Sequence, residues 1–239
     1  MLSRLLFSQQ KFVVINCMLN ISEIFGGFFI FVIRFMLKIL CLHGHGQCSM
    51  YFTQKLGALR NEVKKLCVMS VPDAPFPCPT EDVPDARSWY SFTRLESGQT
   101  DYYDNFEDAV AFLAEYDRAQ GPFDGILSFS QGTVVSVVLA ARANEKLFPS
   151  LKFCVMFSGL LPSDKYLRAD TMALLREKTV SSLHIFGTED KVITPDRSLE
   201  LAMAFGPTAQ VVSHDGGHFV PSSVRKQLKE FVSQFVLRT

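Results

Sequence analysis

Short apolar runs alternate with amphipathic stretches from residue 37 to the C-terminus. An apolar run without polar alternation is typical of a strand buried on both faces, as in a parallel sheet. The pattern predicts strands at 37–42, 66–71, 125–129, 152–159, 181–187 and 209–214, and helices at 50–65, 106–119, 131–146 and 222–236. This alternation predicts an α/β domain with a doubly wound, mostly parallel sheet that is covered by helices.

The first 35 residues have a different character. Residues 12–33 are almost wholly apolar and have about the length of a membrane span. Glu23 lies near the middle of this run, where a carboxylate costs about 2–3 kcal/mol on insertion scales. We therefore divide the chain into a hydrophobic extension, residues 1–35, and a domain, residues 36–239. The extension is either an upstream start, with a domain that begins at Met36, or a membrane anchor.

Composition and charge narrow the function classes. The chain has 239 residues, 24 basic and 24 acidic, and no basic stripe. Such a balance argues against nucleic acid as the main partner. The six cysteines form no C-x-x-C pair and have no metal spacing with histidine, which indicates a reducing compartment. We predict a cytoplasmic protein, with membrane association through residues 12–33 as the alternative.

Two connections between the predicted strands are long. Residues 71–105 carry five of the prolines and the only tryptophan, and residues 159–180 contain a predicted helix. Long connections in compact domains are usually lids or binding loops, and the site of an open α/β sheet lies at the carboxyl ends of its strands. We expect these loops to act as a small lid over a site there.

Ser130 is a candidate nucleophile. It follows the strand 125–129 in the sequence Ser-Phe-Ser-Gln-Gly and opens a predicted helix. A nucleophile elbow has the pattern G-x-S-x-G at such a turn, but Ser128 stands where the first glycine belongs. The pentapeptide alone leaves two interpretations open, a nucleophile and a serine that caps a helix.

Candidate partners follow Ser130 in the order that elbow hydrolases use, an acid and then a histidine. Asp190 lies after the strand 181–187, and His218 lies after the strand 209–214. Glu189 and His214 are the rivals for these two roles. We rank them lower because His214 still belongs to the strand and Glu189 comes one residue earlier in its turn.

The glycine-rich turn after the first strand is a candidate oxyanion hole. His43-Gly44-His45-Gly46 can present the backbone N–H of His45 beside that of Gln131. His43 and His45 have no third ligand nearby, so we predict no metal site. We expect His43 to hold the loop through hydrogen bonds.

Seven sequence blocks, in order, resemble the FSH1-type family of serine hydrolases. They are LKILCLHGHGQ, DAPFPCP, ARSWYSF, GPFDGILSFSQGT, MFSGLLP, HIFGTEDKVI and GGHFVP. The resemblance runs from about Leu37 to the C-terminus and implies an α/β-hydrolase fold. It also implies a triad of Ser130, Asp190 and His218 and activity on carboxylic esters, often with long acyl chains, without a metal or organic cofactor. Ser128 and His45 depart from the family pattern, which has Gly and an aromatic or similar residue there.

We therefore predict a serine hydrolase that cleaves small-molecule esters with an apolar or long acyl chain. Residues in or beside the long loops and the elbow are the candidate lining of an acyl pocket: Phe76, Trp89, Tyr90, Phe129, Leu160, Leu161 and Phe219. Two alternatives stay open. The same triad serves an acyl thioesterase, and Ser128 would suit a non-catalytic ligand-binding protein on a hydrolase fold.

Overall fold

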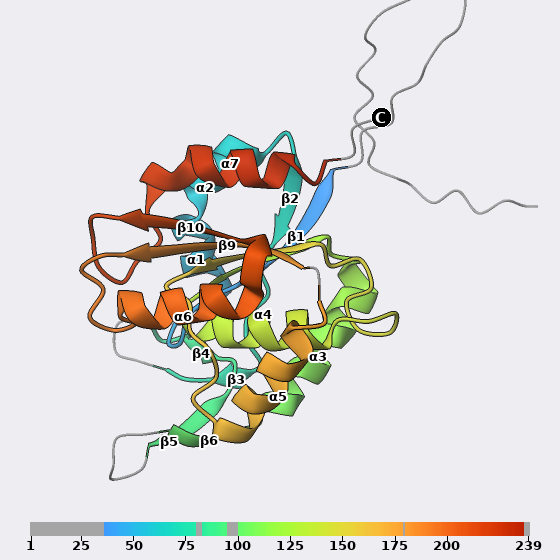
Figure 1. The fold of residues 1–239 in the computed structure, drawn as a ribbon, viewed down its shortest axis with the longest axis vertical. Helices are drawn as coiled ribbons and strands as arrows, with labels where there is room; N and C mark the ends of the chain where they lie inside the picture. Colours follow the sequence, from blue (N-terminus) through green and yellow to red (C-terminus); the bar gives the residue numbers. More distant parts are fainter. Residues whose placement is uncertain (1–35, 80–82, 95–99, 179, 237–239) are drawn as a thin grey trace, which may run out of the picture. The chain divides into compact units, whose positions relative to one another are not determined.

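Six parallel strands form the central sheet of the computed structural model, in the order β10-β9-β8-β7-β1-β2 (Figure 1). Their bounds are β1 Leu37–Leu42, β2 Cys67–Ser70, β7 Gly125–Phe129, β8 Phe153–Phe157, β9 Ser181–Gly187 and β10 Ala209–His214. The structure describes residues 36–79, 83–94, 100–178 and 180–236. The predicted extension 1–35, with its apolar segment 12–33, lies outside these residues.

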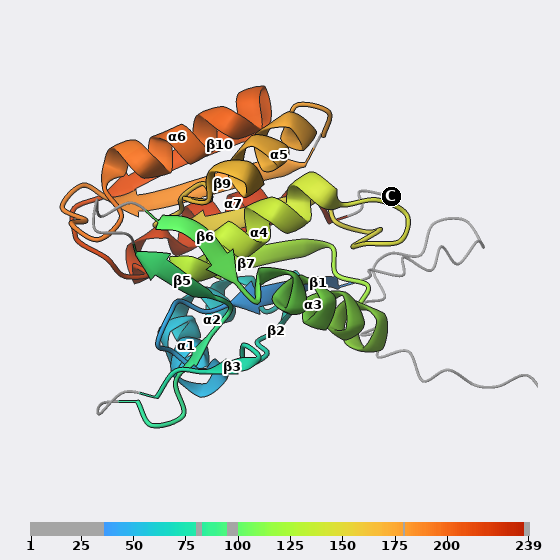
Figure 2. The same cartoon turned by 90° about the horizontal axis from the view of Figure 1, so that it is seen from below.

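Helices cover both faces of the sheet (Figures 1 and 2). One group comprises α1 Ser49–Lys55, α2 Gly57–Val63 and α7 Arg225–Ser233, and the other α3 Phe106–Gln120, α4 Gln131–Arg142, α5 Lys165–Leu175 and α6 Pro195–Phe205. Alternate strand residues enter two separate cores: Phe153 and Val155 pack with the first group, Cys154 and Met156 with the second. This alternation explains the unbroken apolar runs and confirms the doubly wound parallel sheet.

The largest local differences from the predicted elements are three, apart from α4, which ends at Arg142 and not at residue 146. The predicted helix 50–65 is two helices, with a break at Leu56 before Gly57, a residue of low helix propensity. Helix α6 was not predicted at all. The connection 71–105 has structure of its own, two antiparallel pairs: β3 Phe76–Pro77 with β4 Arg87–Ser88, and β5 Ser91–Arg94 with β6 Thr100–Asp104.

The helices of the described part of the chain are short. None of them is long and apolar enough to cross a membrane. Residues Met36–Val236 form one compact unit.

Candidate active site

Ser130 occupies a strained turn between β7 and α4. Its backbone has φ 51° and ψ −120°, a conformation that side-chain-bearing residues rarely adopt. The turn is held by Ser130 N–H, which donates to the carbonyl of Phe157 (3.0 Å), and by Thr133 N–H, which donates to Ser130 O (2.9 Å). This strand-to-helix geometry is the one that lifts a nucleophilic hydroxyl out of a sheet.

The elbow requires a glycine on its helix side. A Cβ on Gly132 would lie 2.6 Å from the carbonyl oxygen of Leu42 and 2.7 Å from that of His43. Ser128, on the strand side, is accommodated: it is fully buried and keeps its parallel pairing with Leu42 and Met156. The departure at position 128 therefore leaves the elbow undistorted.

Two loops at the ends of β9 and β10 are joined by backbone hydrogen bonds. Thr188 N–H donates to His214 O, and Glu189 N–H donates to Gly216 O, both at 2.9 Å. Gly187 allows this approach, because a Cβ there would lie 2.1 Å from Gly216 O. The loop that carries Asp190 is thus fixed against the loop that carries His218.

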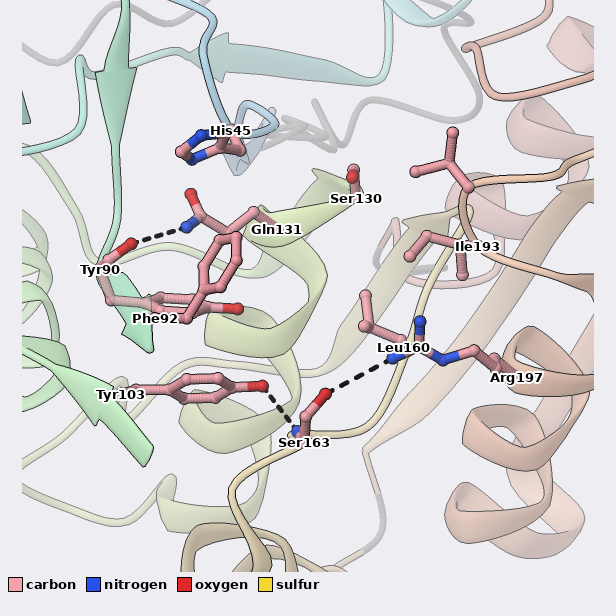
Figure 3. Close-up of a pocket in the computed structure, with 11 residues that line it drawn as sticks. His45, Tyr90, Phe92, Tyr103, Ser130, Gln131, Leu160, Ser163, Ile193 and Arg197 are labelled. Atoms are coloured by element: carbon pink, nitrogen blue, oxygen red, sulfur yellow. Dashed lines mark hydrogen bonds between the residues drawn. The ribbon is translucent and has the colours of Figure 1, made fainter. Parts of the chain in front are cut away.

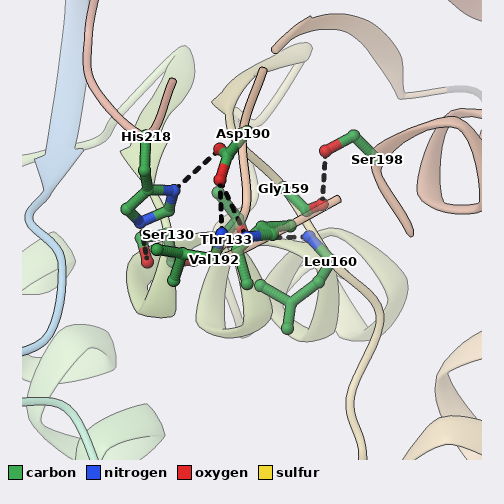
Figure 4. Close-up of polar contacts among 9 residues, drawn as sticks. Ser130, Thr133, Gly159, Leu160, Asp190, Val192, Ser198 and His218 are labelled. Carbon is green, nitrogen blue, oxygen red and sulfur yellow. Dashed lines mark hydrogen bonds and ion pairs between the residues drawn. The ribbon is translucent and has the colours of Figure 1, made fainter. Parts of the chain in front are cut away.

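Ser130, His218 and Asp190 form one hydrogen-bonded chain (Figure 4). The Nε2 atom of His218 lies 3.0 Å from Ser130 Oγ, and its Nδ1 atom lies 2.8 Å from Asp190 Oδ2. An ionised carboxylate can only accept, so Nδ1 carries the proton and Nε2 is free to accept the serine proton. The ring of Phe129 packs against His218 with 4.8 Å between centroids and holds the imidazole from one side.

Asp190 is buried and well supported. Only 3% of its surface is exposed, and its Oδ1 atom accepts from the N–H groups of Val192 and Ile193, both at 2.9 Å. Burial alone would raise the pKa of the Asp190 carboxyl, but hydrogen bonds from His218 and Ile193 and the nearby Ser158 hydroxyl lower it below its ordinary value. The carboxylate form is therefore the stable one beside the imidazole.

The two rival residues lie elsewhere. Glu189 is exposed to solvent beside Asp190. The ring of His214 packs against Phe219, with 5.1 Å between centroids, and its buried Nε2 atom has no hydrogen-bond partner in the described part of the chain. The structure brings together the three residues that the sequence analysis ranked first.

His43 fixes the glycine-rich turn after β1, as predicted. Its Nδ1–H donates to Gly44 O (2.8 Å), and its Nε2 accepts from Ala74 N–H (3.1 Å). Burial lowers the pKa of this histidine, which is fully covered, and so favours its neutral form. The indole N–H of Trp89 donates to His43 O (2.8 Å) and ties the turn to the 87–94 segment.

The side chain of Gln131 joins the same network. Its Oε1 atom accepts from Trp89 N–H (3.0 Å), and its Nε2 atom donates to Tyr90 O (2.8 Å). Because the side chain is engaged with Trp89 and Tyr90, the residue is held with its backbone at the start of α4. The N–H of a first helical residue has no acceptor within its own helix.

His45 lies in the same glycine-rich turn after β1. No described residue accepts a hydrogen bond from its backbone N–H. Its ring contacts Phe92 edge-on at 5.8 Å, and its Nδ1 atom lies 3.2 Å from Ser88 Oγ. Partial burial lowers the pKa of this imidazole. The backbone N–H groups of His45 and Gln131 are thus both unengaged in the described structure.

A cavity of about 270 Å³ opens beside Ser130 (Figure 3). Its wall consists of aromatic, aliphatic and a few polar side chains: His45, Tyr90, Phe92, Tyr103, Ser130, Gln131, Leu160, Ser163, Val192, Ile193 and Arg197. Its volume is near the lower end of the range for small-molecule sites.

Of the seven residues predicted to line an acyl pocket, the structure places two in this wall, Tyr90 and Leu160, and buries Leu161 in the core. Trp89 is fully buried under the glycine-rich turn, and Phe129 supports His218 from the core. Phe76 is half-buried in β3, and Phe219 is exposed at 47%. Aromatic character alone did not distinguish a wall residue from a supporting one.

Most of the cavity wall was not predicted from the sequence. Ile193 and Arg197 flank the start of α6, which was not predicted. A signal was present, since Thr194-Pro195-Asp196 has the proline and the acid that favour a helix start. Phe92 and Tyr103 come from the β5–β6 pair, whose position over the sheet has no signature in the sequence.

Known proteins resemble most of this chain in sequence. The family model "Serine hydrolase (FSH1)" matches residues 33–230. An esterase of Caenorhabditis elegans is 36% identical over 204 residues, which cover 81% of this chain and 90% of that protein. The human protein named Esterase OVCA2 is 33% identical over 225 residues, which cover 83% and 96% of the two chains.

Solved structures share the fold at low sequence identity. The crystal structure of esterase PE8 has a TM-score of 0.62 at 22% identity and covers 84% of this chain and 93% of its own. Acyl-protein thioesterase 2 of Zea mays has a TM-score of 0.62 at 18% identity, with 84% and 94% covered. The α/β-hydrolase fold is therefore established, and the family match shows that the chain belongs to the FSH1 family of serine hydrolases.

Proposed function

We propose that this protein hydrolyses carboxylic esters through an acyl-enzyme on Ser130. The observation that carries the proposal is the hydrogen-bonded chain from Ser130 Oγ through His218 to Asp190, with distances of 3.0 and 2.8 Å. A serine hydroxyl is a weak nucleophile on its own, and it needs a base that a third group orients. This chain of contacts supplies both.

The reaction proceeds in two steps, acylation of Ser130 and hydrolysis of the acyl-enzyme. Ser130 Oγ forms a bond to the ester carbonyl carbon while His218 Nε2 takes the hydroxyl proton. The carbon–oxygen bond to the alcohol then breaks, and the alcohol leaves with that proton. Water, deprotonated by His218, next attacks the acyl-enzyme, and the acid departs as Ser130 regains its proton. Asp190, with its lowered pKa, stabilises the imidazolium in both steps.

The backbone N–H groups of His45 and Gln131 are the proposed oxyanion donors. Both belong to segments that are held rigidly, one by the His43 and Trp89 contacts and the other by the start of α4. Donors fixed before the reaction stabilise the tetrahedral oxyanion without a cost of reorganisation.

The cavity supports an acyl group of modest size. Leu160, Ile193 and Phe92 supply its apolar wall, but about 270 Å³ leaves little room for a long chain. A longer chain would extend past Val192 and Phe92, which are 63% and 41% exposed at the rim. The same steps apply to a thioester, and rates on an oxygen ester and a thioester with one acyl group would rank the two substrates.

Labelling with a fluorophosphonate, located by mass spectrometry, tests the assignment of Ser130. We expect the chain from Met36 to be labelled at Ser130, and Ser130→Ala and His218→Ala to abolish labelling. Ser222→Ala, at an exposed serine outside the site, is the matched control and should label normally. A folded protein that stays unlabelled would instead favour ligand binding without catalysis.

We further propose that the enzyme works in the cytoplasm on small-molecule esters. Residues 12–33 are the candidate for a membrane contact. The distribution of the full chain and of the chain from Met36 between soluble and membrane fractions tests this segment. An equal distribution of the two forms would remove the anchor from consideration.

A further inference from the structure

Arg197 lies in the wall of the cavity, opposite the nucleophile. Of the eleven residues that line this space, it is the one with a permanent charge. In the view of Figure 3, Leu160 and Ile193 lie between Ser130 and the guanidinium of Arg197. The guanidinium contacts Ser163 Oγ through a long hydrogen bond of 3.5 Å. The cavity thus has a polar end at Ser130, an apolar middle, and a cationic end at Arg197.

This cation has no carboxylate partner among the described residues. Glu200, one turn further along α6, is in a position to pair with it, but Glu200 is bound to Arg168 of α5 instead. Asp164 is also engaged, because it caps α5 through the N–H groups of Tyr166 and Leu167. No described carboxylate therefore forms an ion pair with Arg197.

The position of Arg197 does not serve the stability of its helix. It is the third residue of α6, at the N-terminal end, where the helix dipole disfavours a cation. An unpaired, half-buried cation at this end is a cost to the fold. A role in binding an anion accounts for a charge that the fold itself does not use.

The cavity receives the acyl part of a substrate. Its wall includes Ser130 and Gln131, beside the proposed oxyanion donors, but not His218. The leaving alcohol must stay beside His218 Nε2 to receive its proton. The group that extends toward Arg197 is therefore attached to the carbonyl carbon.

We propose that Arg197 is a specificity-determining residue that binds a carboxylate at the far end of the acyl group. The substrates would then be monoesters or monothioesters of dicarboxylic acids, with a short apolar spacer against Leu160 and Ile193. A guanidinium is suited to this role, because its planar fork binds a carboxylate through two parallel hydrogen bonds. The inference rests on the proposed ester hydrolysis at Ser130.

Two nitrophenyl esters of equal acyl length test the inference, a hexanoyl ester and the monoester of adipic acid, which ends in a carboxylate. The wild-type protein should prefer the adipoyl ester in kcat/KM by roughly tenfold to a hundredfold, the range for a hydrogen-bonded charge. Arg197→Gln should abolish this preference. Arg197→Glu should reverse it, in favour of an aminohexanoyl ester that ends in an ammonium group.

Arg142→Gln is the matched control, since this arginine pairs with Glu107 and does not line the cavity. It should keep the wild-type preference. The inference is wrong if the wild-type protein has equal kcat/KM on the adipoyl and hexanoyl esters, or if a folded Arg197→Gln variant keeps the wild-type ratio of the two values. Either result would leave the proposed ester hydrolysis at Ser130 intact. Failure to hydrolyse either ester, together with an unlabelled Ser130, would overturn the proposed function from which it starts.

Discussion

The neighbouring strands β7 and β8 end in nearly the same way, but they present two very different serines. Phe129 pairs with Phe157 at the last position of the two strands, and a serine comes directly after each. Ser130 has φ 51° and Ser158 has φ 46°, so both lie in the left-handed region. Backbone strain is thus common to both strand ends.

The surroundings of the two serines differ. Ser130 is half-buried, faces the cavity and lies 3.0 Å from His218 Nε2. Ser158 is 1% exposed, and its hydroxyl makes no hydrogen bond of good geometry in the described structure, although it lies close enough to Asp190 to help lower the pKa of that carboxyl. A strained turn therefore does not by itself make a serine reactive. An adjacent base and access to substrate do.

The largest expected effect is the difference in ester hydrolysis between alanine substitutions of the two serines. Ser130→Ala should lower kcat/KM on a nitrophenyl ester by at least about 10⁴-fold, because it removes the proposed nucleophile. Ser158→Ala should lower it by less than about tenfold, since Ser158 acts only through Asp190. Steady-state kinetics on both variants, with thermal unfolding to verify folding, measures the difference. Ester hydrolysis by Ser130→Ala within tenfold of wild type would mean that another group attacks.

The second expected effect is the difference between alanine substitutions at the glycines that follow the two serines, Gly132 and Gly159. Gly132→Ala would press a methyl group against two backbone carbonyls, Leu42 O and His43 O, at 2.6 and 2.7 Å. At Gly159 the obstacle is the end of a flexible side chain, Leu201 Cδ2, at 2.6 Å. We expect Gly132→Ala to destabilise the protein by about 1–3 kcal/mol and to lower kcat/KM by about tenfold to a hundredfold.

Gly159→Ala is the counterpart, and we expect at most about half of the loss of stability seen for Gly132→Ala, because the side chain of Leu201 can rotate away. Urea unfolding of both variants, with the rate on one ester, measures the contrast. Equal losses at the two positions would show that the close approach of α4 to the end of β1 is not what sets Gly132 apart.

Much of this comparison could be predicted from the sequence. The bounds of β1, β7, β9 and β10 were predicted correctly, since each is an apolar run between turn residues. The strand-to-helix position of Ser130, and the later acid and histidine, follow from the same strand pattern. The similar positions of Ser158 and Ser130 were not predicted, because they depend on the pairing of Phe129 with Phe157 in the sheet, which is a tertiary property.

The cavity wall could not be predicted from residue type. Trp89 and Phe129 are large and near the elbow, and yet both support the site from within the core. Arg197 lines the cavity because the first turn of α6 lies against it. That Arg197 lacks a carboxylate partner becomes clear only from the structure, in which Glu200 binds Arg168. Side-chain direction and pairing are set by packing, which local periodicity does not report.

The smallest expected effect is the influence of Ser158 on the pH dependence of stability. Asp190 has a lowered pKa in the folded state, so it contributes stability above its unfolded pKa of about 3.9 and loses it as the pH falls through the folded value. Removing the Ser158 hydroxyl should move the pKa of Asp190 back toward its ordinary value. Ser158→Ala should then cost roughly 0.5–1 kcal/mol of unfolding free energy at neutral pH.

This cost should shrink as the pH falls below about 4, where Asp190 is protonated in the unfolded chain. Urea unfolding of the wild-type protein and of Ser158→Ala, between neutral pH and about pH 4, measures this cost as the difference in unfolding free energy. The contribution of the buried histidines is common to both proteins and cancels in the difference. In an Asp190→Asn background, position 190 cannot titrate, and the effect of Ser158→Ala should become independent of pH. A pH-dependent effect that persists in that background would mean that Ser158 acts on a titratable group other than Asp190. The ends of β7 and β8 would then share backbone strain but no role for Ser158 at Asp190.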